Sequence, residues 1–225
     1  HSLTLEAQLM EVRTFEEAGD YVAAVSLLEQ TCATYRANYS RYHPESVDCQ
    51  LNLARFAKET GSLDEAEAIL GAVVIDLAAS SPTIDEMSLG ALMQLAEIYR
   101  ERGEYQASKE LLSGVIATAQ QIGATDTSYT GKAYLARLLT NEGETANAEK
   151  LTLSILDYGR QAWTDQPVQY YNVFLELGAI YQRQGRFPEA EAIFEESMQV
   201  LLEVVGEAYP STLVAMNNLG NVYEQ

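Results

Sequence analysis

The chain has 225 residues, of which 47% are hydrophobic and 21% charged, and this is enough apolar side chain to bury a continuous core. Its 33 acids and 14 bases give a net charge of −19. That excess of acid argues against nucleic acid and an anionic membrane surface as partners, because both require a basic face. No apolar run approaches the roughly 18–20 residues that a membrane-spanning helix needs. We therefore expect protein or peptide partners, and neither nucleic acid nor membrane.

A repeated pattern runs through the whole chain. Single glycines recur at spacings of 42, 42, 40 and 42 residues, at Gly19, Gly61, Gly103, Gly143 and Gly185. On both sides of each glycine, apolar residues recur three and four positions apart, which is typical of one buried helix face. A glycine ends a helix easily because positive φ angles cost it nothing, and the short turn makes the flanking helices antiparallel. A period of this length is the mark of a stacked repeat array.

The pattern predicts an all-α chain of helix pairs. In chain order we expect helices at 3–18 and 21–38, 44–60 and 63–80, 83–102 and 105–122, 127–142 and 145–163, 167–184 and 187–206, and a last, unpaired helix at 210–225. The start signals are prolines in the first turn, a capping box and short polar caps. These signals are Pro44, Pro167 and Pro210, the Thr83–Glu86 box, and Thr125, Asp126 or Thr127.

The two cysteines, Cys32 and Cys49, flank one turn between helices. We expect two small buried thiols there, with a disulfide across the antiparallel helices as the alternative. His1 and Ser2 resemble residues left by cloning, so we expect a fragment of a longer protein. We expect that protein to be cytoplasmic.

The repeated positions resemble a known family. Phe174, Leu177, Gly178 and Tyr181, followed by Ala190-x-x-x-Phe194, match the tetratricopeptide repeat pattern. The period of 40 to 42 residues, with the segments "HPES" and "YPSTLVAMNNLGNVY", resembles the longer repeats of kinesin light chains. The resemblance implies one α-solenoid, a right-handed superhelix of five helix pairs and a terminal helix over residues 1–225. Its repeats would span about 3–40, 44–81, 83–124, 126–164 and 167–207, followed by the helix at 210–225.

Some repeats depart from the pattern. The fourth has Thr145 and Thr152 where the others have bulky apolar residues, so we expect it to be the most loosely packed. The last helix carries Leu213, Met216 and Val222 instead of the polar outer face of a cap. We therefore expect the natural array to continue beyond Gln225.

No constellation of residues indicates catalysis, a metal or a cofactor. Apart from His1 there is one histidine, His43, which we expect to be an exposed turn residue. It cannot complete a zinc site or a nucleophile–base pair, and the single glycines form no phosphate loop. Tyr35, Tyr39 and Tyr42 form the one unusual aromatic group, which we expect to pack a helix end, with contact to a peptide as the alternative.

The resemblance also implies where a ligand binds. In the family, groove contacts come from first-helix positions ten, six and three residues before the turn glycine, which share one face of the helix. Here these positions are Leu9, Arg13, Glu16, Leu51, Arg55, Lys58, Met93, Glu97, Arg100, Ala133, Arg137, Thr140, Leu175, Ala179, Gln182, Asn217, Asn221 and Glu224. They hold five bases and three acids, a slightly basic stripe in an acidic protein. The alternative is a set of ordinary solvated helix residues.

We predict a non-enzymatic interaction module that binds an extended peptide or partner segment with acidic and apolar residues. The expected contacts are Arg13, Leu51, Arg55, Lys58, Met93, Arg100, Arg137, Gln182, Asn217 and Asn221. Arginines would pair with the ligand's carboxylates, and asparagines would hold its backbone. One alternative is the sensor segment of a larger signalling NTPase or transcriptional regulator. A second alternative is a scaffold that self-associates weakly end to end; otherwise we expect a monomer.

Overall fold

The computed structural model describes residues 7–8, 10–12, 14–15, 21–80 and 83–224. In that part of the chain the regular structure is helical and no β-strand occurs. The labelled helices are α2 (Tyr21–Asn38), α3 (Pro44–Glu59), α4 (Leu63–Ser80), α5 (Glu86–Glu101), α6 (Tyr105–Gln121), α7 (Thr125–Glu142), α8 (Thr145–Ala162), α9 (Pro167–Arg183), α10 (Phe187–Val204) and α11 (Pro210–Tyr223). The predicted fold class, an all-α solenoid, is confirmed.

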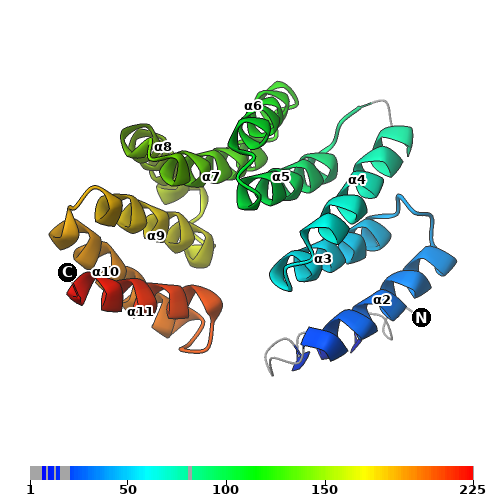
Figure 1. Cartoon of the computed structure of the whole chain (residues 1–225), viewed down its shortest axis with the longest axis horizontal. Helices are drawn as coiled ribbons and strands as arrows, with labels where there is room; N and C mark the ends of the chain where they lie inside the picture. Colours follow the sequence, from blue (N-terminus) through cyan, green and yellow to red (C-terminus); the bar gives the residue numbers. More distant parts are fainter. Residues whose placement is uncertain (1–6, 9, 13, 16–20, 81–82, 225) are drawn as a thin grey trace. The chain divides into compact units, whose positions relative to one another are not determined.

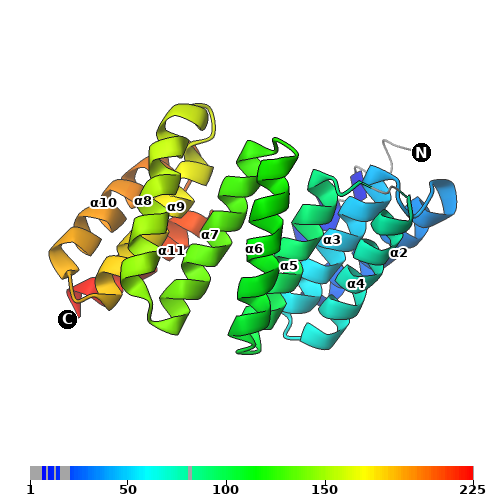
Figure 2. The ribbon, with the colours of Figure 1, turned by 90° about the horizontal axis from the view of Figure 1, so that it is seen from above.

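The helices form two compact units, residues 1–127 and 128–225. In the first unit each helix from α2 to α6 packs against the next one in the chain (Figure 1). In the second unit α8, α9, α10 and α11 do the same, and α11 also contacts α9 (Figure 2). Each unit is therefore a stack of antiparallel helix pairs. Among the described residues, no helix is long and apolar enough to cross a membrane.

The turn between α5 and α6 shows why a glycine recurs. Gly103 has a φ of +79°, which side chains disfavour. Its N–H donates to the carbonyl of Arg100 at 3.0 Å, and the N–H of Glu104 donates to the carbonyl of Tyr99 at 2.8 Å. This pair of bonds closes the helix end in a Schellman motif. Gly61, Gly143 and Gly185 have the same positive φ, whereas Gly19 lies outside the described residues.

Small residues let the two helices of a pair approach closely. Five positions after the turn glycine, Ala66, Ala148 and Ala190 are fully buried, and Ser108 donates its hydroxyl to the carbonyl of Ala96 at 2.8 Å. Nine positions after the glycine, the side chains that enter the core are Leu28, Leu70, Leu112 and Phe194. Phe194 lies directly over Gly178, where an added Cβ would come within 2.5 Å of its ring.

The fourth pair departs from this pattern where the sequence indicated. Thr152 occupies the position of those large side chains and is only 1% exposed. Its hydroxyl has no hydrogen-bond partner. A buried hydroxyl without a partner costs stability, because it has lost its bonds to water.

Most helix starts agree with the sequence signals. Pro44, Pro167 and Pro210 begin α3, α9 and α11. The predicted Thr83–Glu86 capping box is wrong, because α5 begins at Glu86 and Asp85 is its N-cap. The Asp85 carboxylate accepts from the N–H of Ser88 at 2.9 Å and from its hydroxyl at 2.7 Å. An ionised acceptor next to the positive end of the helix is the stronger cap.

The start of α7 also differs from the expectation. The helix begins at Thr125, so the expected caps at 125–127 lie in its first turn.

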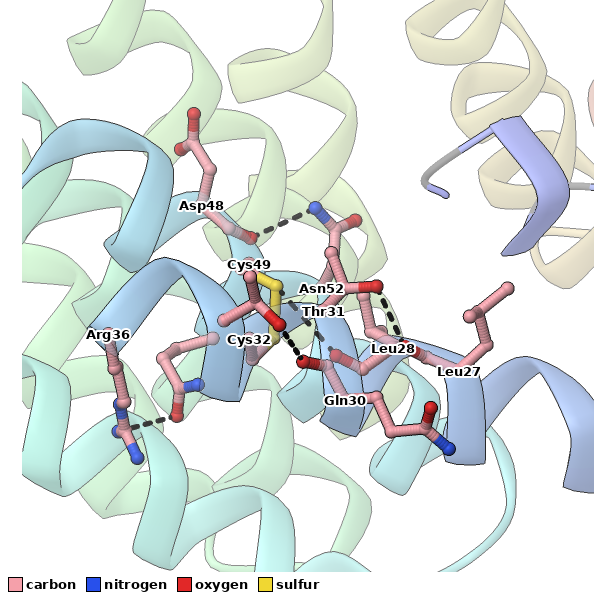
Figure 3. Close-up of a disulfide and its surroundings, with 11 residues drawn as sticks. Leu27, Leu28, Gln30, Thr31, Cys32, Arg36, Asp48, Cys49 and Asn52 are labelled. Atoms are coloured by element: carbon pink, nitrogen blue, oxygen red, sulfur yellow. Dashed lines mark hydrogen bonds between the residues drawn. A yellow bond between two sulfur atoms is a disulfide. The ribbon is translucent and has the colours of Figure 1, made fainter. Parts of the chain in front are cut away.

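A disulfide between Cys32 and Cys49 joins α2 to α3, so the expectation of two free thiols is wrong and the alternative is correct (Figure 3). The Cα atoms are 5.5 Å apart and both side chains are buried. A second link across the same helices runs from Arg36 Nη2 to Gln50 Oε1 at 2.8 Å. Antiparallel packing of α2 on α3 brings the two cysteines within bonding range.

The aromatic residues beside this turn pack at the end of α2. Tyr35 is buried in the same core cluster as Cys32, and Tyr39 packs against that cluster. His43 stacks on Tyr39 with 4.5 Å between ring centroids, and its Nδ1 lies 2.9 Å from Glu45. The His43 side chain is 39% exposed, so the expected exposed turn residue is partly covered by Tyr39.

Ion pairs connect the second helix of one pair to the turn of the next. In the second unit, Arg186 Nη1 lies 2.9 Å from Glu149 Oε1 on α8, and its guanidinium stacks 3.7 Å from the Tyr181 ring centroid. Gln184 Nε2 donates to the other Glu149 oxygen at 2.8 Å. The Gln184 hydrogen bond and then the Arg186 contact hold the pKa of Glu149 below its usual value, against the opposing effect of burial.

The first unit has the same arrangement. Arg102 pairs with Glu67 and Asp64 on α4, and the hydroxyl of Tyr99 lies 3.4 Å from Glu67. Glu67 and Glu149 both lie six residues after a turn glycine, so this cluster is part of the repeat.

Candidate functional site

A pocket of about 690 Å³ opens in the second unit between α7 and α9. Its volume lies within the range of roughly 300–1,000 Å³ that is typical of ligand pockets. Its walls come from α7, the α8–α9 connection, α9 and the last residue of α10. The lining residues are Thr130, Ala133, Tyr134, Arg137, Trp163, Asp165, Gln166, Pro167, Val168, Gln169, Asn172, Val173, Glu176 and Val204.

A second hollow of about 320 Å³ lies between α9 and α11. It shares Arg137, Asn172 and Glu176 with the larger pocket. Its other lining residues are Leu175, Ala179, Pro210, Ser211, Val214 and Asn218. The two hollows therefore lie side by side, and we call them together the C-terminal groove. Its walls are mainly α7, α9 and α11, the first helices of their pairs.

Arg137 lies where the two hollows meet. Its Nη1 is 3.9 Å from Glu176 Oε1, and its guanidinium lies 5.1 Å from the Tyr134 ring centroid. The side chains of Arg137 and Glu176 are 37% and 34% exposed. This ion pair is therefore long and partly exposed to solvent.

The α8–α9 connection forms a rigid wall of the larger pocket. Trp163 is 3% exposed and packs edge-on against Tyr158, with 5.7 Å between ring centroids. Its ring occupies the space beside Gly159, where an added Cβ would come within 2.4 Å. The tryptophan therefore anchors the connection, and Asp165 projects from that connection as an exposed residue.

In the first unit, the expected basic contacts are paired with acids of the same chain. Arg55 lies 2.9 Å from Glu59, and Lys58 lies 3.5 Å from Glu101. Arg100 lies 3.2 Å from Glu97 and 3.4 Å from Glu101. Most of these carboxylates follow or precede their base by one to four residues on the same helix. The stripe therefore offers less free positive charge than the sequence count indicated.

The apolar contacts expected in the first unit are largely part of the core. Met93 is buried, and Leu51 packs against two core clusters. Neither lines the two hollows of the C-terminal groove, and Arg13 lies outside the described residues.

Of the peptide contacts that the sequence predicted in the second unit, Arg137 lines the groove. Leu175 and Ala179, from the same predicted stripe, line the smaller hollow. Gln182 is half-buried, and Asn217 and Asn221 are exposed, but none of these three lines either hollow.

Sequence reasoning missed the positions thirteen and nine residues before the turn glycine. On α7 these are Thr130 and Tyr134, and on α9 they are Asn172 and Glu176. The groove thus lies about one turn nearer the helix N-termini than the predicted stripe. The sequence did contain a signal for these groove positions, because they carry polar or aromatic side chains between apolar residues of α7 and α9. Among the described residues, no group of three His, Cys, Asp or Glu side chains could hold a metal ion.

Comparison with known families identifies the repeat. Three models described as tetratricopeptide repeat match residues 15–82, 88–122 and 170–225, which together make up most of the chain. No curated protein matches the sequence.

Solved structures with the same fold come from several kinds of protein. A putative kinesin light chain from Podospora anserina with nearly identical TPR-like repeats is 24% identical, with a TM-score of 0.62 over 89% of this chain and 96% of that one. The Rap conjugation gene regulator of plasmid pLS20, in complex with the Phr* peptide, is 12% identical, with a TM-score of 0.74 over 98% and 63%. A STAND protein with a tetratricopeptide repeat sensor, from Pyrococcus horikoshii, is 16% identical, with a TM-score of 0.68 over 96% and 31%. With its helix pairs repeating every 40 to 42 residues and its family matches, this chain belongs to the tetratricopeptide repeat proteins.

Proposed function

We propose that the second unit binds an extended peptide segment of a partner protein in the C-terminal groove. The observation that carries the proposal is the pair of adjacent hollows along α7, α9 and α11, the larger of which has a volume of about 690 Å³. Tetratricopeptide repeats are interaction modules, and the role proposed here is binding without catalysis. The Rap regulator in complex with the Phr* peptide supports the proposal, because it is a protein of similar fold that binds a peptide.

The groove offers two kinds of contact. The larger pocket would take an apolar side chain, since Tyr134, Val168 and Val173 contribute to its walls. Arg137 would receive a carboxylate of the ligand in place of the long contact with Glu176. The sequence predicted a ligand with acidic and apolar residues. Its apolar residue would enter the larger pocket, and its acidic residue would bind Arg137.

The predicted basic contacts of the first unit would contribute less to the binding affinity. Arg55, Lys58 and Arg100 would have to exchange their intramolecular carboxylates for those of the ligand. That exchange costs the original pairs, so we expect the first unit to add less affinity than the C-terminal groove.

The test is a selection of random peptides on the 225-residue protein, followed by fluorescence anisotropy with the enriched peptides. We expect Arg137→Glu to weaken binding about ten-fold or more, because a charge-assisted contact contributes about 1.5–3 kcal/mol and reversal adds repulsion. Arg160→Glu is the matched control, since Arg160 is an exposed residue of α8 outside the groove.

A second pair of variants tests the pocket without changing charge. Ala133→Leu would fill part of the pocket wall and weaken binding, whereas Ala146→Leu on the exposed side of α8 would not. Equal affinities for Arg137→Glu, Ala133→Leu and the unaltered protein would rule out the groove as the binding site.

A further inference from the structure

We infer that the larger pocket selects a large apolar residue with a lysine or arginine directly beside it, whose cation is held by Asp165. The inference rests on the peptide binding proposed above and adds the chemistry of the neighbouring residue. It concerns Asp165 in the α8–α9 connection, for which the sequence made no prediction.

The pocket is built for an apolar anchor. Tyr134, Val168 and Val173 provide aromatic and branched walls, and the small Ala133 leaves room between them. Val204 at the end of α10 is 48% exposed and lines the same pocket. Aromatic or large aliphatic side chains gain most from such a site, because they bury the most apolar area.

Asp165 is the one charged residue that lines the larger pocket and not the smaller hollow. It is exposed, and no ion pair joins it to any described residue. Glu176, the other carboxylate of the pocket, already faces Arg137 at 3.9 Å. An approaching cation therefore finds its free counter-charge at Asp165.

The spacing of the charges sets the order of residues in the ligand. Asp165 lies two residues before Pro167, the first residue of α9. Glu176, which faces Arg137, lies nine residues after Pro167, a rise of about 13 Å along the helix axis. An extended peptide covers that length in about four residues. The ligand would thus carry its base beside the anchor, at the Asp165 end, and its acid about four residues away at Arg137.

The net negative charge of the second unit also favours a basic residue in the ligand. Residues 128–225 contain thirteen acids and six bases, so a cationic group is attracted toward this unit before any contact forms. Because Asp165 is exposed, this part of the binding energy should fall with added salt.

A simpler role for Asp165 is to stabilise the N-terminus of α9 by its negative charge. That role affects the stability of the helix and is independent of the residue beside the anchor. The two roles therefore separate when binding and thermal unfolding are measured on the same variant.

The test repeats the random-peptide selection with Asp165→Asn and with the control Asp157→Asn, an exposed acid of α8 outside the pocket. On the unaltered protein and the control, we expect peptides with an aromatic or large aliphatic residue next to Lys or Arg. With Asp165→Asn the basic preference should disappear while the apolar preference stays. For one selected peptide, the affinity should fall about two- to five-fold at low salt, as for an exposed ion pair.

The outcomes distinguish this inference from the function on which it rests. Apolar enrichment without a basic neighbour, or a basic preference that survives in Asp165→Asn, overturns the inference and leaves the peptide groove intact. Failure to enrich any peptide relative to Ala133→Leu overturns both. A loss of thermal stability in Asp165→Asn with unchanged peptide preference assigns the carboxylate to helix stabilisation alone.

Discussion

At the scale of single residues, the repeat shows which positions carry structure. Large apolar side chains nine residues after the turn glycine fill the core, and Thr152 replaces them once. The sequence alone revealed this substitution, because the period aligns the position with Leu28, Leu70, Leu112 and Phe194. It could not reveal whether the threonine hydroxyl has a partner, since that depends on the exact fit of α8 against its neighbours.

We predict that Thr152→Val stabilises the second unit by about 1 kcal/mol, because valine keeps the shape and removes a buried hydroxyl without a partner. Thr140→Val is the control, since this buried threonine donates to the carbonyl of Ala136 at 2.8 Å. Urea unfolding should show a gain for Thr152→Val and none for Thr140→Val. A loss at Thr152 would mean that its hydroxyl has a partner in solution.

Only some of the residues that line the groove could be predicted from the sequence. The predicted stripe contained Arg137, Leu175 and Ala179, which line the groove, and it missed Asn172 and Glu176. The position of the groove along the first helices decides this difference, and the packing of the helices and connections around the groove sets that position. A net charge counted over the stripe was equally incomplete, because Glu59 and Glu101 lie outside the stripe yet neutralise its bases.

At the scale of helices, local signals predicted most of the architecture. Turn glycines and first-turn prolines act through the backbone of a few residues, so they can be recognised without knowledge of the fold. The start of α5 was misplaced because Thr83 and Asp85 are both competent caps, and the neighbouring helices decide between them. The antiparallel arrangement of α2 and α3 was expected, but the distance between their cysteines was not.

Close contact between paired helices leads to a prediction at Gly178. Gly178→Ala should destabilise the second unit by about 1–3 kcal/mol, because its Cβ would meet the fully buried Phe194 ring. Gly220 holds the same repeat position on α11 but has open space around it. Gly220→Ala should therefore be neutral or stabilise by up to about 1 kcal/mol through helix propensity. Equal effects of the two substitutions in thermal unfolding would contradict this packing.

The ion-pair cluster between α8 and the α9–α10 turn predicts a pH dependence. The lowered pKa of Glu149 means that its contribution to stability is present above the unfolded-state pKa and disappears as the pH falls through the folded-state pKa. A double-mutant cycle of Glu149→Ala and Arg186→Ala should give a small favourable coupling energy at pH 7. The coupling should weaken as the pH falls through the folded-state pKa of Glu149, and a coupling that acid leaves unchanged would refute an ionic link.

At the scale of the whole molecule, the two units differ in how they are held together. The Cys32–Cys49 disulfide closes a loop with a sequence separation of 17 residues in the first unit. In a repeat array, stability is roughly a sum of local terms, so a cross-link should act mainly on its own unit.

We predict that reduction of the disulfide, or Cys32→Ala with Cys49→Ala, lowers the stability of the first unit by about 3 kcal/mol. Amide exchange should become faster in α2 and α3, whereas α9–α11 should be unchanged. The double variant should not respond to reductant. Two titratable thiols in the oxidised, unfolded protein would show that the bond is absent.

The central claim, that the C-terminal groove is the peptide-binding site, is tested most directly by amide chemical-shift mapping with a selected peptide. We predict that the largest shifts fall on α7, α9 and α11, around Tyr134, Arg137, Asn172 and Glu176, and that Ala133→Leu abolishes them. Large shifts confined to α8 and α10, or to the first unit, would contradict the claim.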